Sequence, residues 1–211
     1  MRAALMVGIG LAVGAAIAEE KTVMDFESDG VGSEPKGFEF SRTGEGRPGK
    51  WTVIVQEDAP SGKKVLAQTD ADSTDYRFPV AFTGPAMKDL RLSVRCKPVS
   101  GSVDQGCGLV FRLKDANNYY VARANALENN VRLYHVVSGR RRQFGGWNGK
   151  VASGVWHQLA VGAKGDRITV SFDGKIVIDE RDSTFTEAGK FGVWTKADSI
   201  IYFDDLTATP L

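Results

Sequence analysis

Two cysteines carry the chemistry that is easiest to anticipate. Cys96 and Cys107 each lie on the apolar side of a run of alternating apolar and polar residues, 89–97 and 106–113. If residues 100–103 turn the chain back symmetrically, the two cysteines fall opposite each other on neighbouring strands, close enough to bond. We therefore predict a Cys96–Cys107 disulfide, with two buried free thiols as the alternative.

The carboxylates give little support for acid–base catalysis. Retaining glycosidases need two carboxylates about 5 to 5.5 Å apart, and the spacing E-x-D-x-x-E typical of sandwich glycosidases is absent. Asp25 and Glu27 share one face of a strand, but solvated or ion-binding carboxylates are the more ordinary interpretation. The G-x-S-x-G nucleophile motif and a phosphate-binding loop are also absent. We predict no catalytic residue and leave enzymatic activity open.

Long polar side chains gather on one side of the predicted strands 118–125 and 130–137. Planar hydrogen-bonding groups beside an aromatic ring suit a sugar, and the loop QFGGWNG offers the best candidate for an exposed ring. A merely solvated outer face is the ordinary alternative. We predict a ligand-binding patch on a concave sheet, made of Arg112, Arg123, Asn125, Arg132, Tyr134 and Trp147.

Short alternating runs separated by turn residues must position these side chains. Turn signals at Asn129-Asn130, Ser138-Gly139 and Asp173-Gly174 are typical of a sheet meander, and no run has a helical period. We expect residues 28–50 to form a long loop. The pattern predicts an all-β sandwich or barrel, with strands at 51–57, 64–68, 76–82, 89–97, 106–114, 118–125, 130–137, 155–163, 166–172, 175–179, 189–195 and 199–208.

The N-terminus predicts export. Arg2 precedes an apolar run over residues 3–17, and Ala16-Ile17-Ala18 gives the small-x-small pattern of a cleavage site. The run is shorter than the roughly 20 apolar residues of a spanning helix. We predict a signal peptide over 1–18, one domain over 19–211, no membrane span after cleavage, and a periplasmic or extracellular location.

The charge balance excludes one class of partner. The chain has 27 Lys plus Arg and 26 Asp plus Glu, whereas a nucleic-acid-binding protein usually has a basic excess. The run Arg140-Arg141-Arg142 lies in a predicted turn and is interpreted as a solvated hairpin tip, with a contact to an anionic polysaccharide as the alternative. We expect no nucleic-acid partner.

Several motifs resemble concanavalin A-like, LamG-like domains. The run 108–113 followed by 115–120, the strand GVWHQL at 154–159, the Asp173-Gly174-Lys175 hairpin and the closing segment 189–206 carry the resemblance. It implies a jelly-roll β-sandwich of two antiparallel sheets. The same fold serves lectin-like binding modules, family-16 glycoside hydrolases, 3-keto-disaccharide hydrolase-like domains and adhesion modules, so it specifies fold better than function.

The resemblance also suggests a structural calcium ion, because the first and last strands pair at the sheet edge in related jelly rolls. Asp25 and Glu27 would meet Asp205 there, and Ca²⁺ prefers such carboxylate oxygens. Exposed edge charges that limit aggregation are the alternative.

The function that follows is non-catalytic binding of a carbohydrate or polysaccharide by a secreted β-sandwich. Two alternatives stay open: a glycoside hydrolase-like enzyme of the 3-keto-disaccharide hydrolase type, and an adhesion or structural module whose partner is a protein. A large exposed apolar patch would favour the protein partner.

Overall fold

The computed structural model describes residues 21–211, so the predicted signal peptide lies outside the described residues. Within them, no helix is long and apolar enough to cross a membrane. The strands are β1 (Thr22–Met24), β2 (Glu39–Gly44), β3 (Trp51–Val55), β4 (Lys64–Gln68), β5 (Arg77–Met87), β6 (Leu90–Ser100), β7 (Gly106–Asp115), β8 (Asn118–Asn125), β9 (Asn130–Val137), β10 (Arg140–Asn148), β11 (His157–Lys164), β12 (Arg167–Phe172), β13 (Lys175–Arg181), β14 (Gly189–Thr195) and β15 (Ile200–Pro210).

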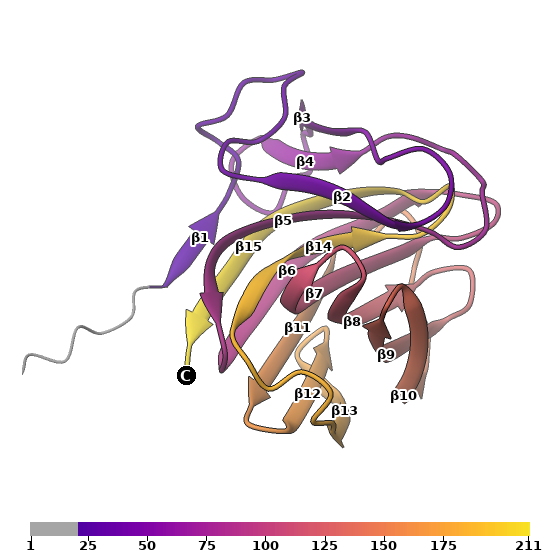
Figure 1. The fold of residues 1–211 in the computed structure, drawn as a ribbon. Coiled ribbons are helices and arrows are strands. Elements are labelled where there is room, and N and C mark those ends of the chain that lie inside the picture. Colours follow the sequence, from indigo (N-terminus) through magenta and orange to yellow (C-terminus); the bar gives the residue numbers. More distant parts are fainter. Residues whose placement is uncertain (1–20) are drawn as a thin grey trace, which may run out of the picture.

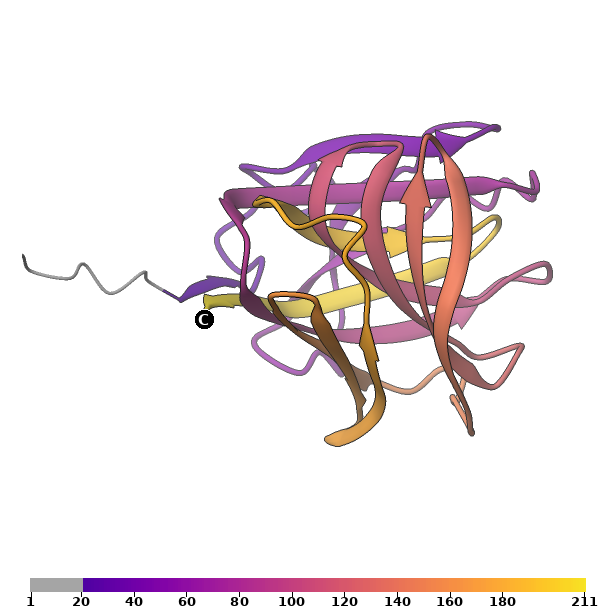
Figure 2. The same cartoon turned by 60° about the horizontal axis from the view of Figure 1, so that its bottom comes forward.

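The strands form two antiparallel sheets that pack face to face (Figures 1 and 2). Sheet A has the order β13-β12-β11-β6-β15-β4-β3, with β1 paired to β15, and sheet B has the order β10-β9-β8-β7-β14-β5-β2. This arrangement confirms the predicted all-β sandwich of two antiparallel sheets.

Alternation along each strand decides which side chains enter the core. In β6 the even-numbered residues from Leu90 to Cys96 are buried between the sheets, while Arg91, Ser93 and Arg95 point outward. Burial of a large aliphatic side chain contributes about 1.5 to 3 kcal/mol, so a shift of register by one residue would be strongly unfavourable.

The predicted turns close three hairpins. Asn129, Ser138 and Asp173 have positive φ angles and lie in the turns after β8, β9 and β12. In the last two turns a glycine with positive φ follows, Gly139 and Gly174, as the tightest hairpins require.

Two strands appear where the sequence predicts none. β2 lies inside the expected loop 28–50 and pairs with β5, and β10 begins at Arg140, in the run interpreted as a hairpin tip. Both are edge strands, and their sequences carry weak alternation. Pairing with a regular neighbour therefore decides their conformation, and β10 has a bulge between Gln143 and Gly145.

Cys96 and Cys107 form the predicted disulfide, but the reason given for it from the sequence is wrong. β6 belongs to sheet A and β7 to sheet B, so the two strands are not hydrogen-bonded neighbours. The bond joins the two sheets through the core, and both cysteines are fully buried.

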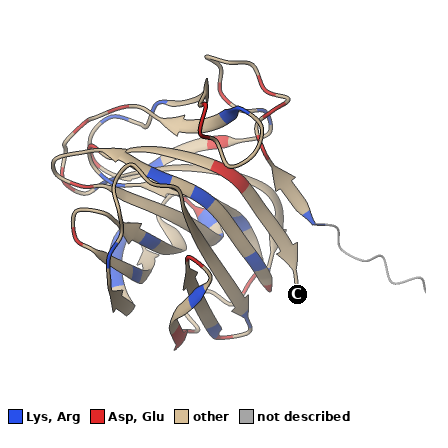
Figure 3. Cartoon of the chain, turned by 180° about the vertical axis from the view of Figure 1, so that it is seen from behind, with Lys and Arg blue, Asp and Glu red and all other residues tan. Residues whose placement is uncertain are grey.

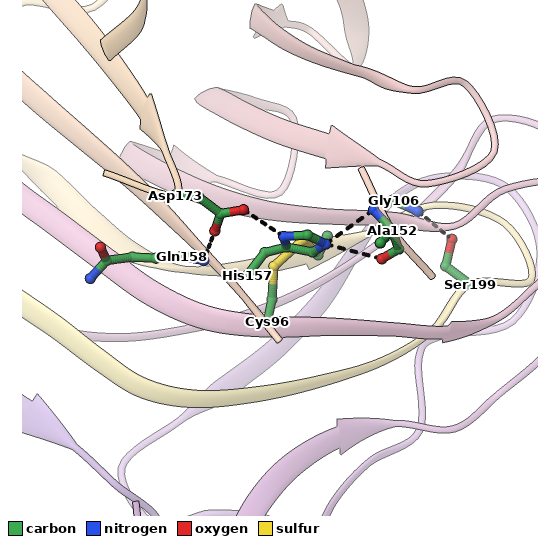
Figure 4. Close-up of a disulfide and its surroundings, with 8 residues drawn as sticks. Cys96, Gly106, Ala152, His157, Gln158, Asp173 and Ser199 are labelled. Atoms are coloured by element: carbon green, nitrogen blue, oxygen red, sulfur yellow. Dashed lines mark hydrogen bonds and ion pairs between the residues drawn. A yellow bond between two sulfur atoms is a disulfide. The ribbon is translucent and has the colours of Figure 1, made fainter. Parts of the chain in front are cut away.

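His157 supports the same end of the core (Figure 4). Its Nδ1 lies 2.8 Å from an oxygen of Asp173, and its Nε2 lies 3.0 Å from the carbonyl oxygen of Ala152. The ring packs 4.8 Å from the ring of Phe172. These contacts give His157 a structural role, in accord with its position in the GVWHQL strand.

Candidate functional site

The outer face of sheet B carries a second apolar cluster, separate from the core between the sheets. The neighbouring strands β8 and β9 supply part of it (Figure 2, pink to salmon), and β5, β7 and β14 supply the rest. Gly108 leaves room for one member, because a Cβ at Gly108 would lie 3.0 Å from Cε3 of Trp194. The cluster comprises Phe78, Val80, Val110, Leu113, Tyr119, Val121, Tyr134, Val136 and Trp194.

Arg141 lies over the aromatic members of this cluster. Its guanidinium carbon is 4.4 Å from the ring centre of Tyr134, 4.7 Å from that of Phe78 and 5.8 Å from that of Trp194, which is cation–π geometry. Burial lowers the pKa of Arg141, and its Nη1 is buried without a hydrogen-bond partner. The site therefore holds a cationic donor that the described residues do not satisfy.

Tyr76 adds an exposed aromatic ring next to Phe78, the ring that Arg141 also contacts. Its side chain is 65% exposed, and its ring lies 6.3 Å from that of Phe78 in an edge-on arrangement. The φ angle of Tyr76 is 55°, a left-handed conformation that is unfavourable for a bulky residue. Backbone strain of this kind often accompanies a functional position.

Arg123 forms the other end of this surface. One terminal nitrogen donates to Oδ1 of Asn130 (2.8 Å), and the other donates to Oε2 of Glu128 (2.7 Å) and to the hydroxyl oxygen of Tyr134 (3.2 Å). The Nε of Arg123 is buried without a partner. We call this group the arginine–aromatic face; its accessible side chains are Tyr76 and the half-buried Arg141, and beneath them lie the buried side chains of Phe78, Arg123, Tyr134 and Trp194.

The carboxylates near Arg123 already form hydrogen bonds or ion pairs with neighbouring side chains. Glu128 accepts hydrogen bonds from Arg123 and from Nδ2 of Asn130. Asp104, 1% exposed, accepts from Nδ2 of Asn125 (2.8 Å) and Nζ of Lys196 (2.7 Å). Burial raises the pKa of Asp104, and the Lys196 ammonium opposes the shift. These contacts fit a rigid binding surface better than a pair of carboxylates that exchange protons with a substrate.

The structure brings together two of the six predicted binding residues, Arg123 and Tyr134. Asn125 lies beside Arg123 but is fully buried. Its Oδ1 accepts the backbone N–H groups of Leu127 and Glu128 and so holds the β8–β9 turn. Asn125 therefore supports the surface from beneath.

Arg132 and Trp147 serve the pairing of β9 and β10. Arg132 donates to the carbonyl oxygen of Trp147 (2.7 Å) and to Oδ1 of Asn148 (2.6 Å). The Trp147 ring is half-buried against the core, 6.2 Å from the ring of Phe172. The bulge in β10 shifts the alternation, so Trp147 faces the opposite side of the sheet from Arg141. Trp147 is not the exposed ring expected from the sequence.

Arg112 is not part of the ligand-binding patch, contrary to the prediction, because its side chain is fully buried. It donates to the carbonyl oxygens of Lys88 (2.7 Å), Phe185 (2.8 Å) and Gly165 (2.7 Å) and to Oδ1 of Asp89 (3.2 Å). Its φ angle of 46° and a register irregularity after Phe111 turn it away from the outer face. Arg112 therefore ties β7 to three turns or connections of the sandwich.

The predicted calcium ligands do not converge. Among residues 21–211 no group of three or more His, Cys, Asp or Glu side chains could hold a metal ion. Glu27 instead accepts the backbone N–H groups of Lys63 and Lys64, which lower its pKa. Asp205 accepts a hydrogen bond from the hydroxyl of Ser61 (2.8 Å). The predicted pairing of the first and last strands is confirmed, since β1 pairs with β15. Asp25 and Glu27, however, follow the end of β1 and do not share a strand face. Glu27 and Asp205 instead accept hydrogen bonds from the segment that leads into β4.

The binding patch predicted from the sequence omits Tyr76 and Arg141, although Arg141 belongs to the run for which a contact to an anionic polysaccharide is the alternative interpretation. A signal for Arg141 existed, because a tight turn at Ser138-Gly139 implies a following strand whose residue opposite Val136 shares its outward face. Nothing in the sequence around Tyr76 indicates its left-handed backbone or its exposure.

No family model matches the chain. The levanase of Bacillus subtilis (strain 168) is 33% identical over 107 residues, which cover 49% of this chain and 15% of the levanase. The chain therefore matches a small part of that protein.

Solved structures confirm the fold class. The carbohydrate-binding module CBM66 from Bacillus subtilis superposes with a TM-score of 0.64 at 21% identity, covering 81% of this chain and 94% of the module. The exoplasmic/lumenal domain of VIP36, solved in its Ca²⁺/Man-bound form, gives 0.59 at 12% identity, covering 90% and 89%. The chain thus has the jelly-roll β-sandwich fold of these proteins. The narrower likeness to LamG-like or 3-keto-disaccharide hydrolase-like domains stays a prediction.

Proposed function

We propose that this protein is an exported, non-catalytic carbohydrate-binding domain that holds its ligand on the arginine–aromatic face. The similarity to levanase carries the proposal, because 33% identity over 107 residues is closer than the structural matches and involves a protein named for a polysaccharide. The module and lectin-like neighbours add support at the level of the fold.

The chemistry of the arginine–aromatic face agrees with this function. The exposed ring of Tyr76 offers an apolar surface to a sugar ring, and the half-buried Arg141 can donate to sugar hydroxyls through Nε and Nη2, since only its Nη1 is buried. The neighbouring carboxylates are held by cations and amides, which favours binding over hydrolysis. The disulfide supports export, since such bonds persist in oxidising compartments.

Levan is the ligand to test first. We expect the purified chain to bind levan in calorimetric titrations, and the variant Tyr76→Asn to bind at least tenfold more weakly. Asparagine tolerates the left-handed backbone at position 76, so this variant removes the ring with little effect on folding. Val31→Asn, which removes a 57% exposed side chain from a loop hydrogen-bonded to β3 in the other sheet, is the matched control.

Two results would contradict the proposal. Failure to bind levan or any other polysaccharide would remove the function, and unchanged binding by Tyr76→Asn would remove this face as the site. Release of reducing sugar from levan by the purified chain would contradict the non-catalytic assignment.

A further inference from the structure

The outer face of sheet A, on the far side of the sandwich from the arginine–aromatic face, has two adjoining hollows of about 490 and 350 Å³. Both are lined by Lys21, Ser93 and Thr207. Ser93 of β6 pairs with Ala160 of β11 on one side and with Thr207 of β15 on the other. Small side chains at these central outward positions leave the face hollowed between the longer side chains that border it.

Basic side chains border these hollows. Arg91 lies at one end and is exposed, Arg95 is half-buried four residues along the same strand, and Lys21 reaches both hollows. Figure 3 shows this side of the molecule, with Lys and Arg positions along the strands beside the C-terminal strand. We call this surface the basic groove; its charged residues are Lys21, Arg91 and Arg95.

The charges of the basic groove are not neutralised within the described residues. Lys21, Arg91 and Arg95 form no ion pair there. The nearby Arg167, by contrast, pairs with Asp179 at 2.6 Å, and Lys97, further along β6, pairs with Asp58 at 2.7 Å. The whole chain has a formal net charge of only +1, so this concentration of cations is a local feature.

Asp205 is the one acidic residue that lines the two hollows, and it accepts a hydrogen bond from Ser61. A ligand that runs past Arg91 and Arg95 therefore meets a positive potential. Charge complementarity requires this ligand to be anionic.

The remaining lining residues distinguish among anionic polymers. The floor presents the hydroxyls of Ser93, Thr169, Ser171 and Thr207 and the amide of Gln158, which can bond to sugar hydroxyls. None of the residues that line the two hollows is aromatic, whereas proteins that bind single-stranded nucleic acids stack bases on aromatic rings. The lining favours a glycan over a nucleic acid.

We propose that the basic groove is a second binding site, for an acidic polysaccharide that carries carboxylate or sulfate groups along an extended chain. Arg91 and Arg95 are four residues apart on one strand, about 13 Å, so they contact separate charged groups while the hydroxyl floor contacts the sugars between them. The site is independent of levan binding, because the two faces are on opposite outer surfaces of the sandwich.

Polygalacturonate is the probe for carboxylates and chondroitin sulfate the probe for sulfates. We expect the purified chain to bind one or both at low salt, with an affinity that falls steeply as salt is added. The double variant Arg91→Gln/Arg95→Gln is expected to bind at least tenfold more weakly and with a shallower salt dependence. Its levan binding should not change, and its circular dichroism and melting temperature should match those of the wild type.

The double variant Arg140→Gln/Arg142→Gln is the matched control. It removes the same charge from two exposed positions on β10, away from the basic groove, and should retain polyanion binding. Equal loss in both double variants would overturn the proposal in favour of unspecific attraction. Absence of polyanion binding at low salt, or tighter binding of poly(dT) than of either glycan, would also overturn it.

Discussion

The two outer faces of this sandwich differ although the same alternation builds both. On sheet B the outward positions of β8, β9 and β10 hold large or charged side chains, so Tyr134, Arg141 and Arg123 fill the surface and order one another. On sheet A the outward positions at the centre of the face, such as Ser93, Ala160 and Thr207, are small, and the surface there is hollowed between longer side chains. Residue size at outward positions therefore decides whether a sheet presents a rigid contact surface or an open groove.

Both outer faces depend on structural elements that lie between the two sheets. Arg112 of sheet B donates to the β5–β6 turn, to the β11–β12 turn and to the β13–β14 connection, and the disulfide crosses from β6 to β7. Changes at these places should affect both faces equally, while changes on one face should leave the other unaffected.

The largest effect is expected from Arg112→Met. The variant keeps much of the side-chain volume but removes the donor to three carbonyl groups and the ion pair with Asp89, whose Oδ1 then accepts only from the backbone N–H of Gly165. Breaking such a buried charged network costs about 3 to 5 kcal/mol, measurable by urea unfolding. Wild-type stability combined with a selective loss of levan binding would instead return Arg112 to the ligand-binding set.

Removal of the disulfide comes next. Cys96→Ala/Cys107→Ala opens a loop with a sequence separation of 11 and should lower the free energy of unfolding by about 3 kcal/mol. Because neither cysteine reaches a surface, levan and polygalacturonate binding should both persist at low temperature. Loss of binding at one face alone, in a variant that is still folded, would contradict the shared role of the bond.

A smaller effect is expected on the pH dependence of the free energy of unfolding, through one residue of sheet A. Asp204 is fully buried in β15, and burial raises its pKa to about 6. The folded chain therefore binds a proton that the unfolded chain has already released, and stability from this group falls as pH rises from about 4 through about 6. The change should be on the order of 2 kcal/mol.

Asp204→Asn isolates this contribution. Unfolding measured from pH 4 to pH 7 should show the decline in the wild type and lack it in the variant, which cannot ionise at position 204. The same slope in both proteins would assign the pH dependence to another group, such as Asp104, whose pKa burial also raises.

The smallest effect is expected from Arg141→Gln, which removes the cation over the Tyr134 and Phe78 rings. Levan binding should weaken about tenfold, equivalent to about 1.4 kcal/mol. The adjacent Arg140→Gln, an exposed position, should change it less than twofold. Equal effects of the two substitutions would show that Arg141 acts only through net charge.

Much of the fold could be predicted from local pattern. The alternation of 118–125 correctly separates Tyr119 and Arg123 from Tyr120, and the turns at Ser138-Gly139 and Asp173-Gly174 have the expected positive φ angles. The edge strands β2 and β10 could not be predicted, since their pairing with distant or regular neighbours overrides weak local preference.

The candidate site was only partly predictable, because two irregularities change which way side chains point. The bulge in β10 puts Trp147 on the core side while Arg141 stays outside. The left-handed backbone at Arg112 takes that residue from the outer face into the interior. Neither irregularity could be recognised from the alternation of apolar and polar residues, because packing around a bulge, and not the local sequence pattern, stabilises it.

Local pattern in the sequence sets the strands with regular alternation and the tight turns, because period-two patterns and turn residues act over a few neighbours. Only the folded arrangement places β6 and β7 in opposite sheets, where the disulfide links them, buries Arg112, and brings Tyr76 and Arg141 against Phe78. These features depend on contacts between residues far apart in the chain, where burial and long-range strand pairing outweigh local preference.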